Sequence, residues 1–200
     1  MTMKRILVTY ATNAGSTADV ARAVGDGLDT NGARVEVRPI EAVTTLTSYD
    51  AVVVGAPMIF GWHREAQAFL KEHQEGLSSL PVAYFMVALS LTQYDEDVYA
   101  GARIYQDASL AKPPRNPDRL RFRERFTSVA NYVQPALESA PQVKPVSIGF
   151  FNGTMAYSSL NLFERVFVQV VFGAAEGDFR NWEAIHAWSQ ALSTALVDGA

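Results

Sequence analysis

The chain begins with a short apolar run that leads through a loop of small and hydroxyl-bearing residues into a helical pattern. The run ends at Val8, positions 9–17 read Thr-Tyr-Ala-Thr-Asn-Ala-Gly-Ser-Thr, and apolar residues recur at helical spacing as far as Leu28. The first N–H groups of a helix have no acceptor within the helix, and the helix dipole is positive at that end. A strand that runs into such a helix therefore predicts an anion site. An ordinary capped helix, with Ser16 or Asn13 as the cap, explains the same residues and stays open as an alternative.

The composition of this loop indicates which anion it suits. The loop has no Lys or Arg, and it matches neither the GxxxxGK[ST] pattern of nucleotide triphosphate loops nor the GxGxxG pattern of dinucleotide sites. Neutral hydroxyl and amide donors, placed around a glycine that lets the backbone approach closely, suit a single phosphate monoester. The predicted phosphate-binding residues are Thr12, Asn13, Ala14, Gly15, Ser16 and Thr17.

Strand and helix patterns alternate along the rest of the chain. Positions 51–55 and 81–89 are almost wholly apolar, as is typical of strands buried on both faces of a parallel sheet. The alternation predicts right-handed βαβ crossovers and an α/β doubly wound sheet. Further strands are expected at 34–38 and 144–151, and helices at about 63–75, 120–137 and 182–196.

One segment interrupts this rhythm. The 200 residues fit a single domain, 1–200. Within it, positions 90–119 carry three acidic residues in a row at 95–97 and three prolines, and they are too many for a plain connection. We expect either a functional loop or an inserted subelement at about 90–119.

Ligands of doubly wound sheets bind at the carboxyl ends of the strands, where two further loops are expected. The first of them is apolar where a surface loop is normally polar, which favours contact with a flat aromatic ligand. Its rings could instead fold back onto the helices or enter a dimer contact, so both interpretations stand. The candidate residues are Pro57, Met58, Ile59, Phe60, Gly61 and Trp62 in this loop, and Ala88, Leu89, Ser90 and Thr92 in the next.

Composition excludes several classes of protein. A net charge of −4 argues against nucleic-acid binding, and the absence of Cys excludes disulfides and thiolate metal sites. The three histidines are scattered without metal-ligand spacing, so no metal site is expected. The first residues run straight into a strand without a signal sequence, which predicts a cytoplasmic protein.

The three loops together resemble those of the flavodoxin family. Positions 12–17 are similar to its T-x-x-G-x-T phosphate loop, and 55–62 and 88–92 fall where its ring-covering loops lie. Closest within that family are the menaquinone-dependent protoporphyrinogen IX dehydrogenases. The residues similar to them are Gly61-Trp62-His63 with its helix through Phe69, positions 150–172, positions 173–178 and Trp182-Glu183. The resemblance covers most of the chain except about 94–139.

This resemblance implies a fold, a cofactor and a type of reaction. The implied fold is a flavodoxin-like α/β doubly wound five-stranded parallel sheet with helices on both faces. The implied cofactor is FMN, with its phosphate on Asn13 to Thr17 and its ring stacked on Phe60 or Trp62. The implied function is an FMN-dependent oxidoreductase that oxidises a flat, protoporphyrinogen-like organic donor or reduces a quinone. A flavodoxin-type electron carrier between redox partner proteins is the alternative.

The remaining partner assignments come from one apolar stretch. Positions 161–172 are apolar at helical spacing, with further apolar residues around the helix. This pattern suits a core face, a homodimer contact or a peripheral contact with the inner face of the membrane, and a core or dimer role is favoured because the basic face typical of interfacial helices is missing.

Overall fold

The computed structural model describes residues 3–29, 32–58, 61–155 and 176–197. The stretch 161–172 and the second-loop candidates Ile59 and Phe60 therefore lie outside the described residues. Within the described ranges, no helix is long and apolar enough to cross a bilayer.

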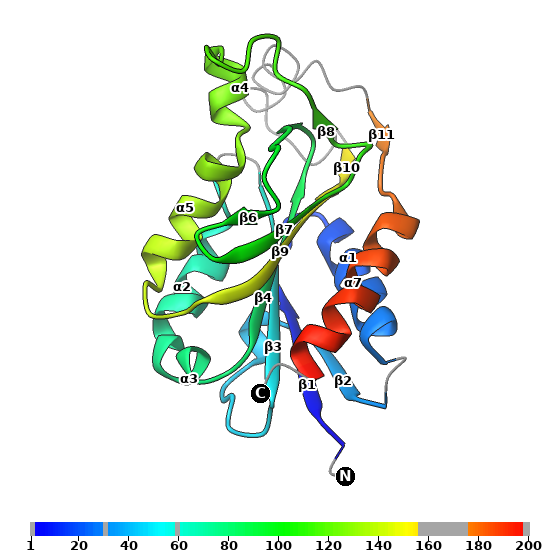
Figure 1. Ribbon diagram of the computed structural model, residues 1–200. Helices are drawn as coiled ribbons and strands as arrows, with labels where there is room; N and C mark the ends of the chain where they lie inside the picture. The colour runs from blue at the N-terminus through cyan, green and yellow to red at the C-terminus, as the bar shows by residue number, and fades with distance from the viewer. Residues whose placement is uncertain (1–2, 30–31, 59–60, 156–175, 198–200) are drawn as a thin grey trace.

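A mostly parallel sheet forms the centre of the molecule (Figure 1). Its parallel core has the order β2-β1-β3-β4-β9, in which each strand is joined to the next along the chain through a helical or inserted connection. The doubly wound architecture predicted from the sequence is confirmed. The strands of this core are β1 (Arg5–Tyr10), β2 (Arg34–Pro39), β3 (Ala51–Pro57), β4 (Val82–Ala88) and β9 (Pro145–Asn152).

The sheet is wider than the five strands expected. In the described chain it has seven strands, because the inserted segment adds two at the β9 side. β7 (Ala102–Gln106) pairs parallel with β9, and β6 (Val98–Tyr99) pairs antiparallel with β7. Sequence reasoning missed them because a five-residue and a two-residue strand carry little periodicity. Covering the long apolar strand β9 also removes an exposed edge.

Helices cover both faces of the sheet, as expected (Figure 1). α1 (Ser16–Leu28) and α7 (Trp182–Val197) pack on one face, where Val24 and Trp188 enter a core with Phe85. α2 (Arg64–Glu72) and α5 (Val129–Ser139) pack on the other face. The smaller elements are η2 (Ile40–Ala42), α3 (Gln74–Ser78), β5 (Leu91–Thr92), β8 (Ala111–Lys112), α4 (Phe122–Phe126), β10 (Thr154–Met155) and β11 (Gly177–Asp178).

Two helices predicted as continuous are interrupted. The helix expected at 63–75 ends as α2 at Glu72 and restarts as α3, which runs on to Ser78. The helix expected at 120–137 is divided into α4 and α5 at Thr127 and Ser128. Here Thr127 pairs with β5, whose Thr92 N–H donates to the Thr127 carbonyl at 2.8 Å, and the Ser128 hydroxyl caps α5. A long-range pairing thus overrides the local helical pattern.

Candidate functional site

The predicted phosphate loop connects β1 to α1 at the carboxyl edge of the sheet. Gly15 occupies the N-cap position of α1 with a φ of 89°, a left-handed conformation that favours glycine. Among the described residues, no side-chain hydrogen bond caps this helix. The backbone N–H groups of Ser16 and Thr17 have no acceptor among the described residues, so the helix start is open to an anion. The capped-helix alternative does not apply here.

The side chains of the loop present hydroxyl groups at the same place. The Thr12 hydroxyl oxygen accepts the Gly15 N–H at 2.9 Å, which leaves the Thr12 proton free to donate. Thr17 is 1% exposed, and its hydroxyl has no partner in the described chain. An unpaired buried hydroxyl is costly unless a ligand completes its hydrogen bonds. Asn13, Ala14 and Gly15 are exposed, which leaves the mouth of the loop accessible.

The second loop is a tight turn after β3. Met58 and Trp62 form an antiparallel bridge, and Gly61 takes a φ of 110° to close the turn. The Met58 N–H donates to the Val87 carbonyl at 2.8 Å, which fixes the turn to β4. Pro57 is partly exposed at the end of β3.

Trp62 lies in the core rather than at the surface of this loop. It is 2% exposed, and its ring packs against Tyr84 with 5.4 Å between the ring centroids. The Gln67 side chain donates to the Trp62 carbonyl at 2.6 Å and holds the turn to α2. Trp62 therefore folds back into the protein, as the alternative interpretation of this loop predicted. Its ring lies in the core that α2 covers.

The third loop connects β4 to β5. The Ala88 carbonyl accepts the Gly153 N–H at 3.1 Å, and the Ser90 carbonyl accepts the Tyr132 hydroxyl at 2.9 Å. Burial raises the pKa of Tyr132, so that it stays a neutral donor. Leu89 and Ser90 are partly exposed.

Thr92, by contrast, serves the scaffold of the insert. Its hydroxyl donates to the Glu124 carbonyl at 2.7 Å and lies 2.9 Å from the Thr127 hydroxyl, and the residue is 6% exposed. The candidate residues 12–17, Pro57, Met58, Gly61 and 88–90 thus follow the carboxyl ends of the neighbouring strands β1, β3 and β4, whereas Trp62 and Thr92 are buried.

A contact that sequence reasoning missed joins the first two loops. His63 Nε2 lies 2.7 Å from Asn13 Oδ1, and Glu65 lies 3.8 Å from the other ring nitrogen. Because Asn13 and His63 are 50 positions apart, no local pattern could pair them. The only signal available was the place of His63 directly after the second loop.

A second missed contact anchors the C-terminal part of the chain to the first turn of α1. Arg180 donates to Asp178 at 2.8 and 2.5 Å and to Asp19 at 2.8 Å, and it lies over the Trp182 ring. Hydrogen bonds to Asp178 and Asp19 raise the pKa of Arg180, and the Arg180 guanidinium lowers the pKa of Asp178. In this clamp, formed by Arg180, Asp178 and Asp19, the single positive charge of Arg180 is paired with two carboxylates. The phosphate loop 12–17 itself carries no Lys or Arg and offers only uncharged donors.

Comparison with solved structures gives the same architecture. A flavodiiron protein from Giardia intestinalis superposes with a TM-score of 0.53 over 98% of this chain and 37% of its own, at 12% identity. A short-chain flavodoxin associated with a bacterial microcompartment superposes with a TM-score of 0.50 over 99% of both chains, at 13% identity. At these identities the likeness shows the fold alone.

Comparison of sequences gives relatives of low identity and a family. A protoporphyrinogen IX dehydrogenase [quinone] from Escherichia coli K12 is 30% identical over 88 residues, which are 42% of this chain and 49% of that protein. One from Leishmania major is 22% identical over 92% of this chain and 73% of its own. The match thus spans about half the length of the bacterial relative. The family model described as Flavodoxin domain (Flavodoxin_5) matches residues 7–181. With this match over most of its length, and with the strand order and open helix start described above, the chain belongs to the flavodoxin family.

Proposed function

We propose that this protein binds FMN in the three loops and acts as an FMN-dependent oxidoreductase. The observation that carries the proposal is the start of α1, where an uncapped helix, a left-handed Gly15 and the unpaired, buried Thr17 hydroxyl meet. These groups fit a phosphate monoester, because many neutral donors and the positive helix end together balance its charge. Membership of the flavodoxin family supports FMN as the molecule that carries this phosphate.

Each loop would contact a different part of FMN. The amides of Asn13, Ala14, Ser16 and Thr17 and the hydroxyls of Thr12, Ser16 and Thr17 would hold the phosphate, while the Gly15 N–H is already bonded to the Thr12 hydroxyl oxygen. The second loop, with Phe60, covers one face of the ring. Backbone groups of 57–61 and 88–90 bond to the ring edge. Trp62 supports this loop from below, since its ring is buried against Tyr84.

Bound FMN supplies one- and two-electron redox chemistry, and the loops around it decide which donors reach it. We propose a flat organic compound of the protoporphyrinogen type as the donor, or a quinone as the acceptor. The names of the relatives from Escherichia coli and Leishmania major support this choice. A relative from Acidovorax ebreus, 32% identical over 81 residues, is named NAD(P)H dehydrogenase (quinone), which supports quinone as an acceptor.

The first experiment tests the cofactor. Purified protein should be yellow, should show flavin absorption bands, and should release FMN rather than FAD on denaturation. A colourless protein that stays colourless after incubation with FMN would contradict the proposal.

The second experiment tests the reaction. FMN-loaded protein is assayed without oxygen, with protoporphyrinogen as donor and a short-chain quinone as acceptor. Steady turnover without any partner protein supports the enzyme. Reduction and reoxidation of the flavin only in the presence of redox proteins would instead identify a flavodoxin-type carrier.

A further inference from the structure

The inserted segment carries an unusual concentration of positive charge. Positions 112–125 hold six basic side chains and two acidic ones, in a protein whose net charge is −4. Arg115, Arg119, Arg121 and Arg125 are exposed, and no carboxylate of the described chain forms an ion pair with them. Such a cluster repels itself unless an anion occupies it.

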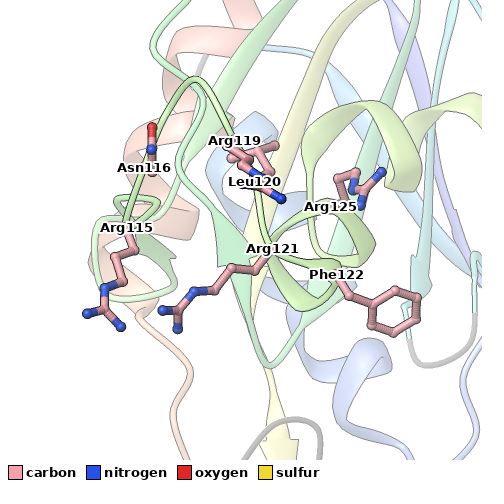
Figure 2. Close-up of a pocket in the computed structure, with 7 residues that line it drawn as sticks. All are labelled: Arg115, Asn116, Arg119, Leu120, Arg121, Phe122 and Arg125. Atoms are coloured by element: carbon pink, nitrogen blue, oxygen red, sulfur yellow. The ribbon is translucent and has the colours of Figure 1, made fainter.

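These four arginines surround a cavity of about 600 Å³, called the arginine cavity below (Figure 2). Arg115 and Arg121 extend side by side from neighbouring parts of the segment. Leu120 and Phe122 provide apolar surface beside the charges, and Phe122 is 76% exposed. A large ring left this exposed next to unpaired cations suits a ligand that is both flat and anionic.

The segment is held in place before any ligand arrives. The two carboxylate oxygens of Glu124 accept the backbone N–H groups of Arg115 at 2.9 Å and Arg121 at 2.6 Å. Because Glu124 binds these backbone groups and not the guanidinium groups, it orders the segment while leaving the arginine side chains available. The Thr92 hydroxyl bonds to the Glu124 carbonyl and so joins α4 to β5. β5 begins three positions after the end of β4.

A second cavity, of about 760 Å³, adjoins the first and shares Leu120 and Arg125 with it. It is called the tyrosine cavity below, because Tyr94, Pro114, Pro117 and Val129 line its walls. It also reaches Thr92, next to the third loop of the cofactor site.

The tyrosine cavity is polarised. Asp95 and Glu96 lie on its lining together with Arg125, which it shares with the arginine cavity. The Tyr94 hydroxyl donates to Glu96 at 3.1 Å. An anionic group is repelled by the two acids and attracted by the arginines, so a ligand that spans both cavities has one favourable orientation.

We propose that the two cavities form one binding site for a flat organic polyanion. Its apolar body lies in the tyrosine cavity, and its carboxylate or phosphate groups bind Arg115, Arg119, Arg121 and Arg125. As a substrate site this rests on the proposed function, since Thr92 on the lining of the tyrosine cavity adjoins the third loop, which would contact the FMN ring. The binding itself does not require turnover.

The test measures binding to the FMN-loaded protein by the fluorescence anisotropy of a porphyrin. Coproporphyrin, which carries four carboxylates, is compared with a tetracationic N-methylpyridyl porphyrin of the same ring size. Coproporphyrin is expected to bind more tightly at low salt and to weaken as salt increases, whereas the cationic porphyrin is not expected to bind. Equal binding of both porphyrins would overturn the proposal.

Matched variants locate the site. Arg115→Gln combined with Arg121→Gln should raise the Kd for coproporphyrin about 10-fold or more, because hydrogen bonds between charged groups are the strong ones. Arg34→Gln combined with Lys144→Gln removes the same charge from exposed positions at the amino ends of β2 and β9, and should change the Kd less than about 2-fold. All four side chains are exposed, so these variants should fold. Equal effects of the two pairs would overturn the proposal.

Two further measurements separate the sources of the anion and the two hypotheses. Displacement of coproporphyrin by NADP⁺ indicates that the site prefers phosphates, and failure of NADP⁺ to displace it indicates that the site prefers carboxylates. Either result supports the site only when the binding of coproporphyrin depends on Arg115 and Arg121. Arginine-dependent flotation with phosphatidylglycerol vesicles, without porphyrin binding, would overturn the proposal in favour of a membrane contact. Turnover that is unaffected by the arginine pair would refute the role of the two cavities as the substrate site but leave the proposed enzyme intact. Arginine-dependent binding without turnover would refute the enzyme alone.

Discussion

Single atoms decide the chemistry of the first loop. The Thr17 hydroxyl and the Tyr84 hydroxyl are both buried and unpaired among the described residues, yet they occupy different places. Thr17 stands at the open start of α1, whereas Tyr84 lies within β4 behind Trp62. Burial raises the pKa of Tyr84 above the ordinary tyrosine value, so its hydroxyl keeps its proton. Removal of each hydroxyl should therefore have a different effect.

Thr17→Val keeps the side-chain shape and removes the hydroxyl. We expect FMN affinity to fall about 10-fold, because a hydrogen bond to a charged phosphate contributes about 1.5–3 kcal/mol. The FMN-free protein should keep its stability, since an unpaired buried polar group is removed. Titration of FMN by fluorescence quenching measures the affinity, and thermal unfolding measures the stability. Tyr84→Phe is the matched control and should leave FMN affinity unchanged; equal affinities of the wild type and Thr17→Val would contradict the phosphate placement.

Gly15→Ala tests the backbone conformation of the same loop. An added Cβ meets nothing within 4 Å, so the cost comes from the φ of 89° alone, about 1–2 kcal/mol. We expect that loss of stability together with weaker FMN binding. Gly101→Ala is a matched control, because Gly101 has a φ of 87° and also has free space, in the turn between β6 and β7. It should lose similar stability in urea unfolding while FMN affinity stays the same; a parallel loss of affinity would show that the effect is not local to the phosphate loop.

At the scale of elements, the insert is held to the core by a few hydrogen bonds. Thr92 joins β5 to α4 and to the break between α4 and α5. Gln106 and Tyr94 exchange two bonds between β7 and the start of the insert, at 2.9 and 2.6 Å. Thr92 and Tyr94 also line the tyrosine cavity, so these contacts hold part of its wall.

Thr92→Val removes the hydroxyl that bonds to Glu124 and Thr127. We expect a loss of about 1–3 kcal/mol, because buried acceptors lose their donor. Amide hydrogen exchange should become faster in α4 and stay slow in β1 and β3. Thr45→Val removes an exposed hydroxyl that bonds only near its own turn, and should cost less than about 0.5 kcal/mol. Unchanged exchange in α4 would show that Thr92 does not secure the insert.

At the scale of the whole molecule, the Arg180 clamp joins the C-terminal part of the chain to its first helix. It connects β11 to the first turn of α1, across 161 positions of the chain. The Arg180 guanidinium is 13% exposed, whereas Asp178 and Asp19 are about half exposed. The clamp is therefore screened by solvent on its acidic side.

The clamp predicts a stability change in acid. The Arg180 guanidinium lowers the pKa of Asp178 in the folded protein, so the contribution is present above the ordinary aspartate pKa of about 3.9 and is lost as pH falls below it. Because Asp178 is half exposed, we expect a contribution of at most about 1 kcal/mol. Urea unfolding between pH 6 and pH 3 should show a smaller pH dependence in Asp178→Asn than in the wild type. Asp118→Asn, in the insert, is the control; identical pH dependence of the wild type and Asp178→Asn would contradict the clamp.

The sequence by itself determined the parts that depend on neighbouring residues. The apolar runs at 51–55 and 81–89 identified strands buried on both faces, because burial on both sides leaves no polar position in such a run. The order of small and hydroxyl-bearing residues at 12–17 predicted a helix start suited to a phosphate, and the structure has Gly15 at φ > 0 and an open helix start there, because both are local properties. These features specified the doubly wound architecture and the first loop.

Only the tertiary structure decided the parts that depend on distant residues. The place of Trp62 behind its loop, the Asn13–His63 contact and the pairing of β7 with β9 each arise from partners more than 20 positions away. The break at Thr127 shows the same effect, because its pairing with Thr92 outweighs a continuous helical pattern. Side-chain periodicity indicates which face of an element is buried, but it does not indicate which other element covers that face. The arginine and tyrosine cavities likewise exist only once the insert has folded back over the carboxyl edge of the sheet (Figure 1).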